Sequence, residues 1–355
     1  MIKIGIVGTG GIAELHAKEF QKIPDSSVIS ACDVSKERLN FFCDKFDIKE
    51  RYNSVEELLQ KSDVDAITNT TPDAFHKDIS IKAIENNKHI FCEKPLAENY
   101  EDALEMCAAL KGKELVNMVN FSYRNSSGYQ ELVKIVKSGK IGNVVHLDAN
   151  YYQSWLTSKY WGDWKEEEKW LWRLSTKHGS KGTLGDIGVH IFDFASFPVG
   201  GIKKINANLK TFKSKGEKIG EYVLDANDTF ISMVEFDNGA IGTISATRFA
   251  TGYSNRLELR IFGDKGAVKI EFDDPIREGS KLLFTDDINR EFSDRKDKLE
   301  WKKIETSTTL NNFERFISSI KNKTPYEPDF ARGAEIQKIL DKCIESDEKK
   351  SWVNL

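Results

Sequence analysis

The sequence lacks the features that mark disulfide-rich, membrane-spanning and nucleic-acid-binding proteins. Its five cysteines, an odd number, include no Cys-x-x-Cys pair, which argues against a disulfide framework and against a structural zinc site. No apolar stretch reaches the ~20 residues that a membrane helix needs. Acidic residues outnumber basic ones by 56 to 52 and no basic stripe is visible, so we expect neither a nucleic-acid nor a membrane partner. No secretory signal precedes the first glycines, and we expect a cytoplasmic protein.

The order of apolar and polar residues divides the chain in two. At 355 residues the chain exceeds what one hydrophobic core usually spans. Up to about residue 121, strand-like segments alternate with helical ones, which predicts a parallel sheet wound with helices. The predicted strands are 2–7, 28–32, 66–69, 89–92 and 115–120, and the predicted helices are 12–21, 36–46, 54–59, 74–86 and 100–111.

Beyond residue 121 the pattern changes to alternation with period two, interrupted by turn signals such as Asp237-Asn238-Gly239. This predicts an α+β domain with a largely antiparallel sheet. Its predicted strands are 144–152, 205–212, 228–236, 240–249, 257–262 and 267–272, with helices at 129–137, 311–320 and 334–343.

A glycine-rich loop follows the first predicted strand and precedes a helix. Its pattern, Gly8-x-Gly10-x-x-Ala13, matches the fingerprint of a Rossmann dinucleotide-binding domain, in which free N–H groups at a helix start meet the pyrophosphate. Asp33 ends the second strand, where its carboxylate would accept hydrogen bonds from the adenosine ribose and repel a 2′-phosphate. We therefore expect NAD rather than NADP, although a plain βα turn with an incidental Asp remains the alternative. The expected cofactor contacts in this region are Gly8, Thr9, Gly10, Gly11, Ile12, Asp33 and Arg38.

Taken together, several short stretches resemble the Gfo/Idh/MocA oxidoreductase family, which includes inositol dehydrogenases and glucose-fructose oxidoreductase. The stretches are Gly8-x-Gly10-x-x-Ala13, Thr71-Pro72-Asp73-Ala74-Phe75-His76, Glu93-Lys94-Pro95, Tyr123-Arg124 and Gly185-Asp186-Ile187-Gly188-Val189-His190. The resemblance covers nearly the whole chain. One departure is that Asn125-Ser126-Ser127 follows Arg124, where the family often has a proline three residues after the arginine.

The resemblance implies an α/β protein with two domains. A Rossmann domain at residues 1–121 is followed at 122–355 by an α+β domain with a large, mostly antiparallel open sheet, and the C-terminal helices could pack back on the first domain. In many members the outer face of that sheet makes a dimer or tetramer, so we expect a homo-oligomer. The resemblance also implies cofactor contacts from Thr70, Thr71, Pro72, His76, Glu93 and Lys94.

Three residues are expected to carry the chemistry. Lys94 follows a strand at the carboxyl edge of the sheet, where it could polarise a reacting oxygen or relay its proton. The residue pattern alone favours a surface lysine in a salt bridge, and the resemblance favours the catalytic role. Asp186 and His190 share one face if Asp186 lies in the first turn of a helix, although a packed His with an N-cap Asp is the alternative. The resemblance makes His190 the acid/base and Asp186 a substrate ligand or the residue that orients His190. No third ligand accompanies the pair, so we expect no metal.

The substrate is expected to meet Arg124, Trp172 and Arg173 besides Lys94, Asp186 and His190. Five of the seven tryptophans lie between residues 155 and 172, where they would line a carbohydrate cleft or build a packed corner. His16, His89, His146 and His178 carry no expected role.

These residues predict an NAD-dependent dehydrogenase that acts on a sugar, cyclitol or polyol. A non-catalytic NAD-binding regulator and a glycosidase that uses NAD transiently are the alternatives within the same superfamily. A regulator would not need Lys94, Asp186 and His190 together.

Overall fold

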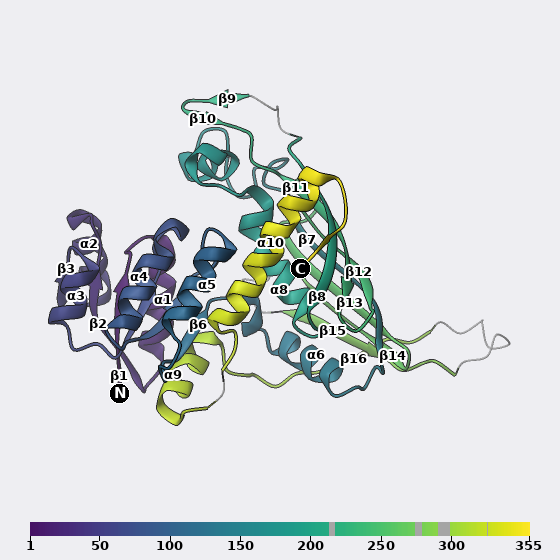
Figure 1. Cartoon of the computed structure of the whole chain (residues 1–355), viewed down its shortest axis with the longest axis horizontal. Coiled ribbons are helices and arrows are strands. Elements are labelled where there is room, and N and C mark those ends of the chain that lie inside the picture. The colour runs from purple at the N-terminus through teal and green to yellow at the C-terminus, as the bar shows by residue number, and fades with distance from the viewer. Residues whose placement is uncertain (213–216, 274–278, 290–298, 325) are drawn as a thin grey trace. The chain divides into compact units, whose positions relative to one another are not determined.

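The computed structural model describes residues 1–212, 217–273, 279–289, 299–324 and 326–355 (Figure 1). They form two compact units, each made of two chain segments. The first contains Met1–Ser122 and Leu310–Lys338, and the second contains Tyr123–Thr309 and Ile339–Leu355. The C-terminal helices are thereby divided, because Asn312–Asn322 (α9) belongs to the first unit and Phe330–Lys349 (α10) contributes to both.

A six-stranded parallel sheet forms the centre of the first unit. Its strands run in the order β3-β2-β1-β4-β5-β6, so the chain reverses its direction of winding between β1 and β4, and parallel sheets bind ligands at such a point. The strands are β1 (Ile2–Val7), β2 (Ser26–Cys32), β3 (Glu50–Tyr52), β4 (Ala66–Asn69), β5 (His89–Cys92) and β6 (Asn117–Val119). The predicted parallel sheet is confirmed, while β3, with only three residues, was too short for its periodicity to be recognised.

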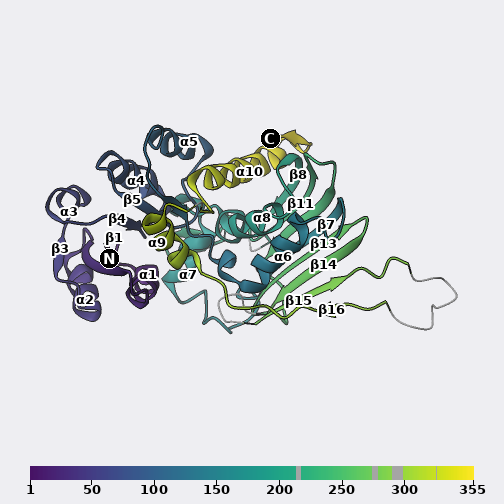
Figure 2. The ribbon, with the colours of Figure 1, turned by 90° about the horizontal axis from the view of Figure 1, so that it is seen from below.

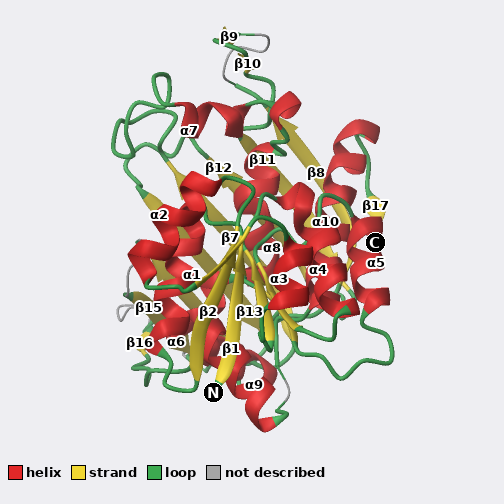
Figure 3. Cartoon of the chain, turned by 90° about the vertical axis from the view of Figure 1, so that its left-hand side faces the viewer, coloured by secondary structure: helices red, strands yellow, loops and turns green. Residues whose placement is uncertain are grey.

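Five helices connect these strands and lie on both sides of the sheet (Figure 3). They are α1 (Gly11–Lys22), α2 (Lys36–Phe46), α3 (Val55–Lys61), α4 (His76–Glu85) and α5 (Tyr100–Ala109). Side-chain caps begin several of them: Ser35, Ser54 and Asn99 each accept a hydrogen bond from the backbone N–H three residues later. Phe313 of α9 joins Phe20 and Phe91 in the buried aromatic core of this unit.

A nine-stranded sheet dominates the second unit. Its order is β16-β15-β14-β13-β7-β12-β11-β8-β17, and each neighbouring pair is antiparallel except β7 and β12. The strands are β7 (Val144–Gln153), β8 (Ile202–Lys210), β11 (Thr229–Phe236), β12 (Ile241–Thr247), β13 (Asn255–Gly263), β14 (Gly266–Phe272), β15 (Ser280–Thr285), β16 (Lys302–Lys303) and β17 (Val353–Asn354); a separate small hairpin pairs β9 (Lys218–Ile219) with β10 (Tyr222–Val223). The predicted α+β unit with a mostly antiparallel sheet is confirmed.

The two faces of this sheet differ. Helices α6 (Ser127–Lys137) and α8 (Val189–Ser196) cover one face (Figure 2). On the other face Ile231, Met233 and Ile241 are 61%, 49% and 56% exposed, while Phe230, Ser232 and Val234, which alternate with the first two, are buried. This alternation is what a sheet packed on one side produces, but the exposed positions carry apolar residues. A short helix, α7 (Glu168–Leu171), lies in the long connection after β7.

Among the residues that the structure describes, no helix is both long enough and apolar enough to span a bilayer.

Candidate active site

The glycine loop joins β1 to α1 at the winding reversal of the first sheet. Gly8 adopts a φ of +88°, and a Cβ there would meet backbone atoms of Thr70 at 3.0 Å, so only glycine fits without strain. At Gly10 and Gly11 an added Cβ would meet no atom within 4 Å, and Gly10 begins α1 without a side-chain cap. The loop thus presents open backbone at a helix N-terminus, which suits a pyrophosphate. Ile12 is 42% exposed beside it.

Asp33 is tied to this loop. One carboxylate oxygen accepts hydrogen bonds from the N–H and hydroxyl of Thr9 at 2.8 and 2.9 Å. The other accepts from the N–H of Ser35 at 2.8 Å and from the guanidinium of Arg38 at 2.9 Å. Burial would raise the pKa of Asp33, but these donors outweigh burial and lower that pKa, so the group is an anion.

A carboxylate has room for about four hydrogen bonds, so ribose hydroxyls must displace one of those present. The Arg38 side chain is 60% exposed and is the partner that can move away most easily. We therefore propose that Arg38 turns from Asp33 toward the cofactor when the ribose binds.

We expect Asp33→Ala to raise the Kd for NAD about tenfold or more, because hydrogen bonds to a charged group each contribute ~1.5–3 kcal/mol. The preference for NAD over NADP should weaken at the same time. Titration of both cofactors against the variant measures this, with Asp44→Ala on the exposed face of α2 as the control. An unchanged ratio of the two Kd values would show that Asp33 does not distinguish the adenosine ribose of NAD from the phosphorylated ribose of NADP.

The loop after β4 runs alongside the glycine loop. The hydroxyl of Thr70 donates to the carbonyl oxygen of Gly8 at 2.8 Å, and the hydroxyl of Thr71 donates to the side chain of Asn69 at 2.7 Å. Thr71 is half-buried and Pro72 is exposed. The structure therefore brings Thr70, Thr71 and Pro72 to the same edge of the sheet as the glycine loop.

Glu93 and Lys94 follow β5 at that edge. Glu93 is buried, and its carboxylate accepts hydrogen bonds from Asn120 at 2.6 Å and from the backbone N–H of Lys94 at 3.2 Å. Burial would raise the pKa of Glu93, yet hydrogen bonds from His16 and Asn120 outweigh it and lower that pKa. Glu93 is thus a buried anion that fixes the lysine backbone from within the unit, and its expected contact with the cofactor stays a prediction.

His16, for which the sequence suggested no role, is fully buried beneath this turn. Its Nε2 lies 2.8 Å from Glu93 and its Nδ1 lies 2.7 Å from the hydroxyl of Thr68. The ring also packs edge-on against Phe91 and Phe313. His16 therefore connects the helix of the glycine loop to the turn that carries Lys94.

Asp186 and His190 lie in the second unit on one continuous helical segment. Residues 184–188 form a π-helical turn that runs into α8, and Thr183 before them already has right-handed helical backbone. His190 therefore lies inside this helical segment and not in its first turn. The imidazole ring is largely buried and packs on Tyr123, with ring centres 4.5 Å apart. π-Helical turns are frequent at functional sites.

Asp186 has a buried partner that the sequence did not reveal. Arg248 is fully buried, and its guanidinium lies 2.8 Å from the Asp186 carboxylate and 4.8 Å from the ring centre of Trp155. Burial lowers the pKa of Arg248 despite the neighbouring charge of Asp186. Because an exposed fraction of 31% leaves the Asp186 side chain accessible, this pair presents an oriented carboxylate.

Arg124 forms a buried ion pair that the sequence did not predict. Its side chain is 4% exposed, and it holds Asp193 of α8 through two hydrogen bonds of 2.7 and 2.6 Å. The guanidinium also stacks on Phe197 at 3.6 Å from the ring centre. This buried ion pair anchors α8, and the expected contact of Arg124 with substrate stays a prediction.

Most tryptophans of residues 155–172 pack into one hydrophobic cluster. Trp155 and Trp164 are buried with Leu171 and Leu174, and Trp170 stacks on Trp155. Trp172 differs, since it is 40% exposed and the Arg173 guanidinium lies 4.5 Å from its ring centre. Arg173 in turn approaches Asp186 at 3.9 Å. Trp172 and Arg173 are thus the members of this segment that can face a ligand.

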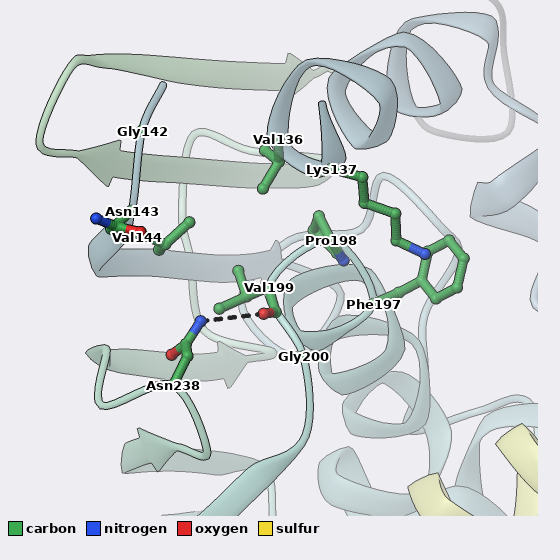
Figure 4. Close-up of a pocket in the computed structure, with 10 residues that line it drawn as sticks. All are labelled: Val136, Lys137, Gly142, Asn143, Val144, Phe197, Pro198, Val199, Gly200 and Asn238. Carbon is green, nitrogen blue, oxygen red and sulfur yellow. Dashed lines mark hydrogen bonds between the residues drawn. The ribbon is translucent and has the colours of Figure 1, made fainter. Parts of the chain in front are cut away.

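A pocket of about 420 Å³ lies elsewhere in the second unit, beside the ends of α6 and α8 (Figure 4). Lys137, Phe197 and Asn238 are part of its lining, and none of the expected site residues is. Across the described part of the chain, no three His, Cys, Asp or Glu side chains are arranged to hold a metal ion.

Comparisons with known proteins bear on the whole chain. A family model described as the oxidoreductase family (GFO_IDH_MocA) with an NAD-binding Rossmann fold matches residues 2–121, and the C-terminal alpha/beta domain of that family matches residues 133–355. Levoglucosan dehydrogenase of Pseudarthrobacter phenanthrenivorans is 25% identical over 400 residues, covering 100% of this chain and 98% of the relative. Myo-inositol 2-dehydrogenase of Thermotoga maritima is 27% identical, covering 91% and 90%.

Solved structures agree in fold. A levoglucosan dehydrogenase in complex with NADH and levoglucosan superimposes with a TM-score of 0.87 at 24% identity, covering 99% of both chains. An oxidoreductase domain protein from Kribbella flavida gives 0.86 at 27% identity, covering 99% of this chain and 98% of the other. The expected fold class is confirmed.

Proposed function

We propose that this chain, which belongs to the Gfo/Idh/MocA family of NAD-binding oxidoreductases, transfers a hydride between a carbinol of a sugar, cyclitol or polyol and nicotinamide. Family membership confirms the predicted oxidoreductase class and NAD as the cofactor. The observation that carries the proposal is that Lys94 lies two residues after the end of β5, at the same sheet edge as the glycine loop. The names of the relatives, dehydrogenases of levoglucosan and myo-inositol, support a polyhydroxylated substrate.

Oxidation of a carbinol moves a hydride from carbon and a proton from oxygen. NAD, when bound, supplies the hydride acceptor. In our proposal Lys94 donates a hydrogen bond to the reacting oxygen and stabilises the negative charge that develops on it. The imidazole of His190 takes the hydroxyl proton as general base and returns it in the reverse reaction.

Asp186 is proposed to bind a neighbouring substrate hydroxyl or to orient His190. Its ion pair with Arg248 supports either role, because a carboxylate fixed by a buried guanidinium keeps one orientation. Trp172 and Arg173 would form a face against which the C–H groups of a sugar pack. All these groups belong to the second unit, which we therefore propose as the source of substrate specificity.

A spectrophotometric screen of sugars, inositols and linear polyols with NAD and NADP tests the proposal. The expected result is a rise in nicotinamide absorbance with at least one polyol, larger with NAD than with NADP. Cofactor binding without turnover across the panel would favour a non-catalytic regulator. Cleavage of an aryl glycoside with no net change in NAD would favour the glycosidase alternative.

We further propose that the open face of the nine-stranded sheet joins copies of this chain. Ile231, Met233 and Ile241 place exposed apolar side chains on strands β11 and β12, where water contact is unfavourable. Light scattering should give the mass of a dimer or tetramer, and Ile231→Lys should lower that mass. A wild-type protein that is monomeric at micromolar concentration would contradict this assignment.

A further inference from the structure

His76 contacts the turn that carries Lys94, and its hydrogen bonds constrain the charge of the His76 ring. The residue is 1% exposed at the start of α4. Its Nδ1 lies 2.7 Å from the carbonyl oxygen of Pro95, and its Nε2 lies 2.9 Å from the carbonyl oxygen of Thr71. Carbonyl oxygens only accept hydrogen bonds, so each ring nitrogen must carry a hydrogen to make its contact favourable.

A neutral imidazole has a single N–H and would turn a nitrogen lone pair toward one of these oxygens. Only the doubly protonated ring satisfies both contacts. The thiol of Cys92, on β5, is the titratable group that faces the ring from the neighbouring strand, and the start of α4 contributes a positive dipole that opposes a cation. Burial lowers the pKa of His76, but the sulfur of Cys92 and the two carbonyl oxygens outweigh burial and raise it.

The two carbonyl oxygens belong to different loops. Thr71 follows β4 and Pro95 follows β5, two neighbouring parallel strands. Thr71 belongs to the loop that is expected to contact the cofactor, and Pro95 is the residue after Lys94. His76 is therefore the direct link between the loop that lines the cofactor and the turn that presents the lysine.

We propose that His76 is a positioning residue that, as a buried imidazolium, fixes the Lys94 turn against the Thr71 loop. This inference rests on the proposed role of Lys94 in catalysis. It assigns His76 no contact with substrate or cofactor, and it modifies the expectation that His76 is itself a cofactor ligand. His16 holds the same turn from its other side through Glu93, so the lysine backbone is fixed between two buried histidines.

The charge of His76 can be measured without any substrate. In the full-length protein labelled with ¹⁵N-histidine, the two ring nitrogens of His76, assigned by comparison with His76→Gln, should both show the protonated chemical shift from about pH 6 to pH 8, where an ordinary imidazole loses its proton. A neutral tautomer at any point in this range would overturn the charge assignment. This readout does not depend on Lys94 or on activity, so it separates failure of the inference from failure of the proposed function.

The positioning role is tested by kinetics with the polyol that the screen identifies. We expect His76→Gln to lower kcat about tenfold while the Kd for NAD changes less than twofold, because only the lysine geometry is lost. In a Lys94→Ala background the same change should have no further effect on kcat. Full additivity of the two effects, or a kcat within twofold of wild type for His76→Gln, would overturn the role.

A matched control separates positioning from stability. His89→Gln changes the same residue type at the opposite end of β5, where Nδ1 accepts a hydrogen bond from the N–H of Val116 at 2.9 Å. We expect this variant to lower the melting temperature but to keep kcat. An equal loss of kcat in His89→Gln would show that the His76 effect is a general loss of stability and would overturn the proposal.

Discussion

Lys94→Ala is expected to lower kcat by a factor on the order of 10² or more while NAD binds with nearly unchanged affinity. The reason is that the ammonium group is proposed to interact with the reacting oxygen, whose charge grows only in the transition state. The cofactor phosphates and ribose are instead expected to meet the glycine loop and Asp33. A change confined to the transition state lowers kcat and leaves Kd alone.

The structure makes this prediction specific to the lysine side chain. The backbone N–H of Lys94 is bonded to Glu93, which Asn120 and His16 hold in turn, so truncating the side chain leaves the turn in place. Lys94→Met preserves most of the side-chain volume and should lose as much activity as Lys94→Ala. Lys111→Ala, at an exposed position, is the control. A kcat within a few-fold of wild type in Lys94→Met would reject the role of the ammonium group.

His190→Asn is expected to lower kcat to a similar extent, again by a factor on the order of 10² or more, since a positioned general base contributes 10²–10⁴-fold. Its second effect should be on the pH profile. The limb of the kcat profile that falls toward low pH reports the base, and it should disappear in the variant. His146→Asn, on the exposed part of β7, is the matched control.

Packing complicates the interpretation of any His190 variant, because the ring stacks on Tyr123 inside the unit. Loss of that contact alone would lower the melting temperature and leave the shape of the pH profile unchanged. Retention of the low-pH limb in a folded His190→Asn protein would therefore assign the residue to packing and reject it as the base. Rescue of turnover by added imidazole would support the assignment.

The fold could be predicted from the sequence because its evidence is local. Strands β1, β4 and β5 are short apolar runs ended by glycine, threonine-proline or lysine-proline, and α2 was predicted with its exact bounds. The glycine loop is also recognisable in the sequence. Gly8 occupies a backbone conformation that other residues rarely adopt, so a glycine is required there. The very short strands β3, β16 and β17 exist through pairing with distant segments, and so no local pattern marks them.

The supporting residues of the site could not be found in this way. His16 sits on the buried face of α1 with Ala13, Ala17 and Phe20, and its partners Thr68 and Glu93 come from two later strands. One signal was available: a histidine on an otherwise apolar helix face must find hydrogen-bond partners, which suggests a buried network. Arg248 is similar, because an arginine at the end of an apolar strand needs a buried acid, and Asp186 lies 62 positions earlier in the chain.

Arg124 shows a second limit of short motifs. Its expected contact with substrate stays a prediction, and its partners Asp193 and Phe197 could not be read from the tyrosine-arginine pair. A short sequence stretch reveals that a residue matters without revealing whether it contacts a ligand or supports the residues that do.

The central claim, direct hydride transfer from a carbinol to nicotinamide, is tested most directly with a labelled substrate. The polyol found in the screen, carrying deuterium at the carbon that is oxidised, is incubated with the wild-type protein and NAD, and the nucleotide is recovered for mass spectrometry. The account predicts reduced nicotinamide that carries one deuterium and a ketone product that has lost it. Recovery of only oxidised, unlabelled NAD, with or without cleavage of a glycosidic bond, would contradict it.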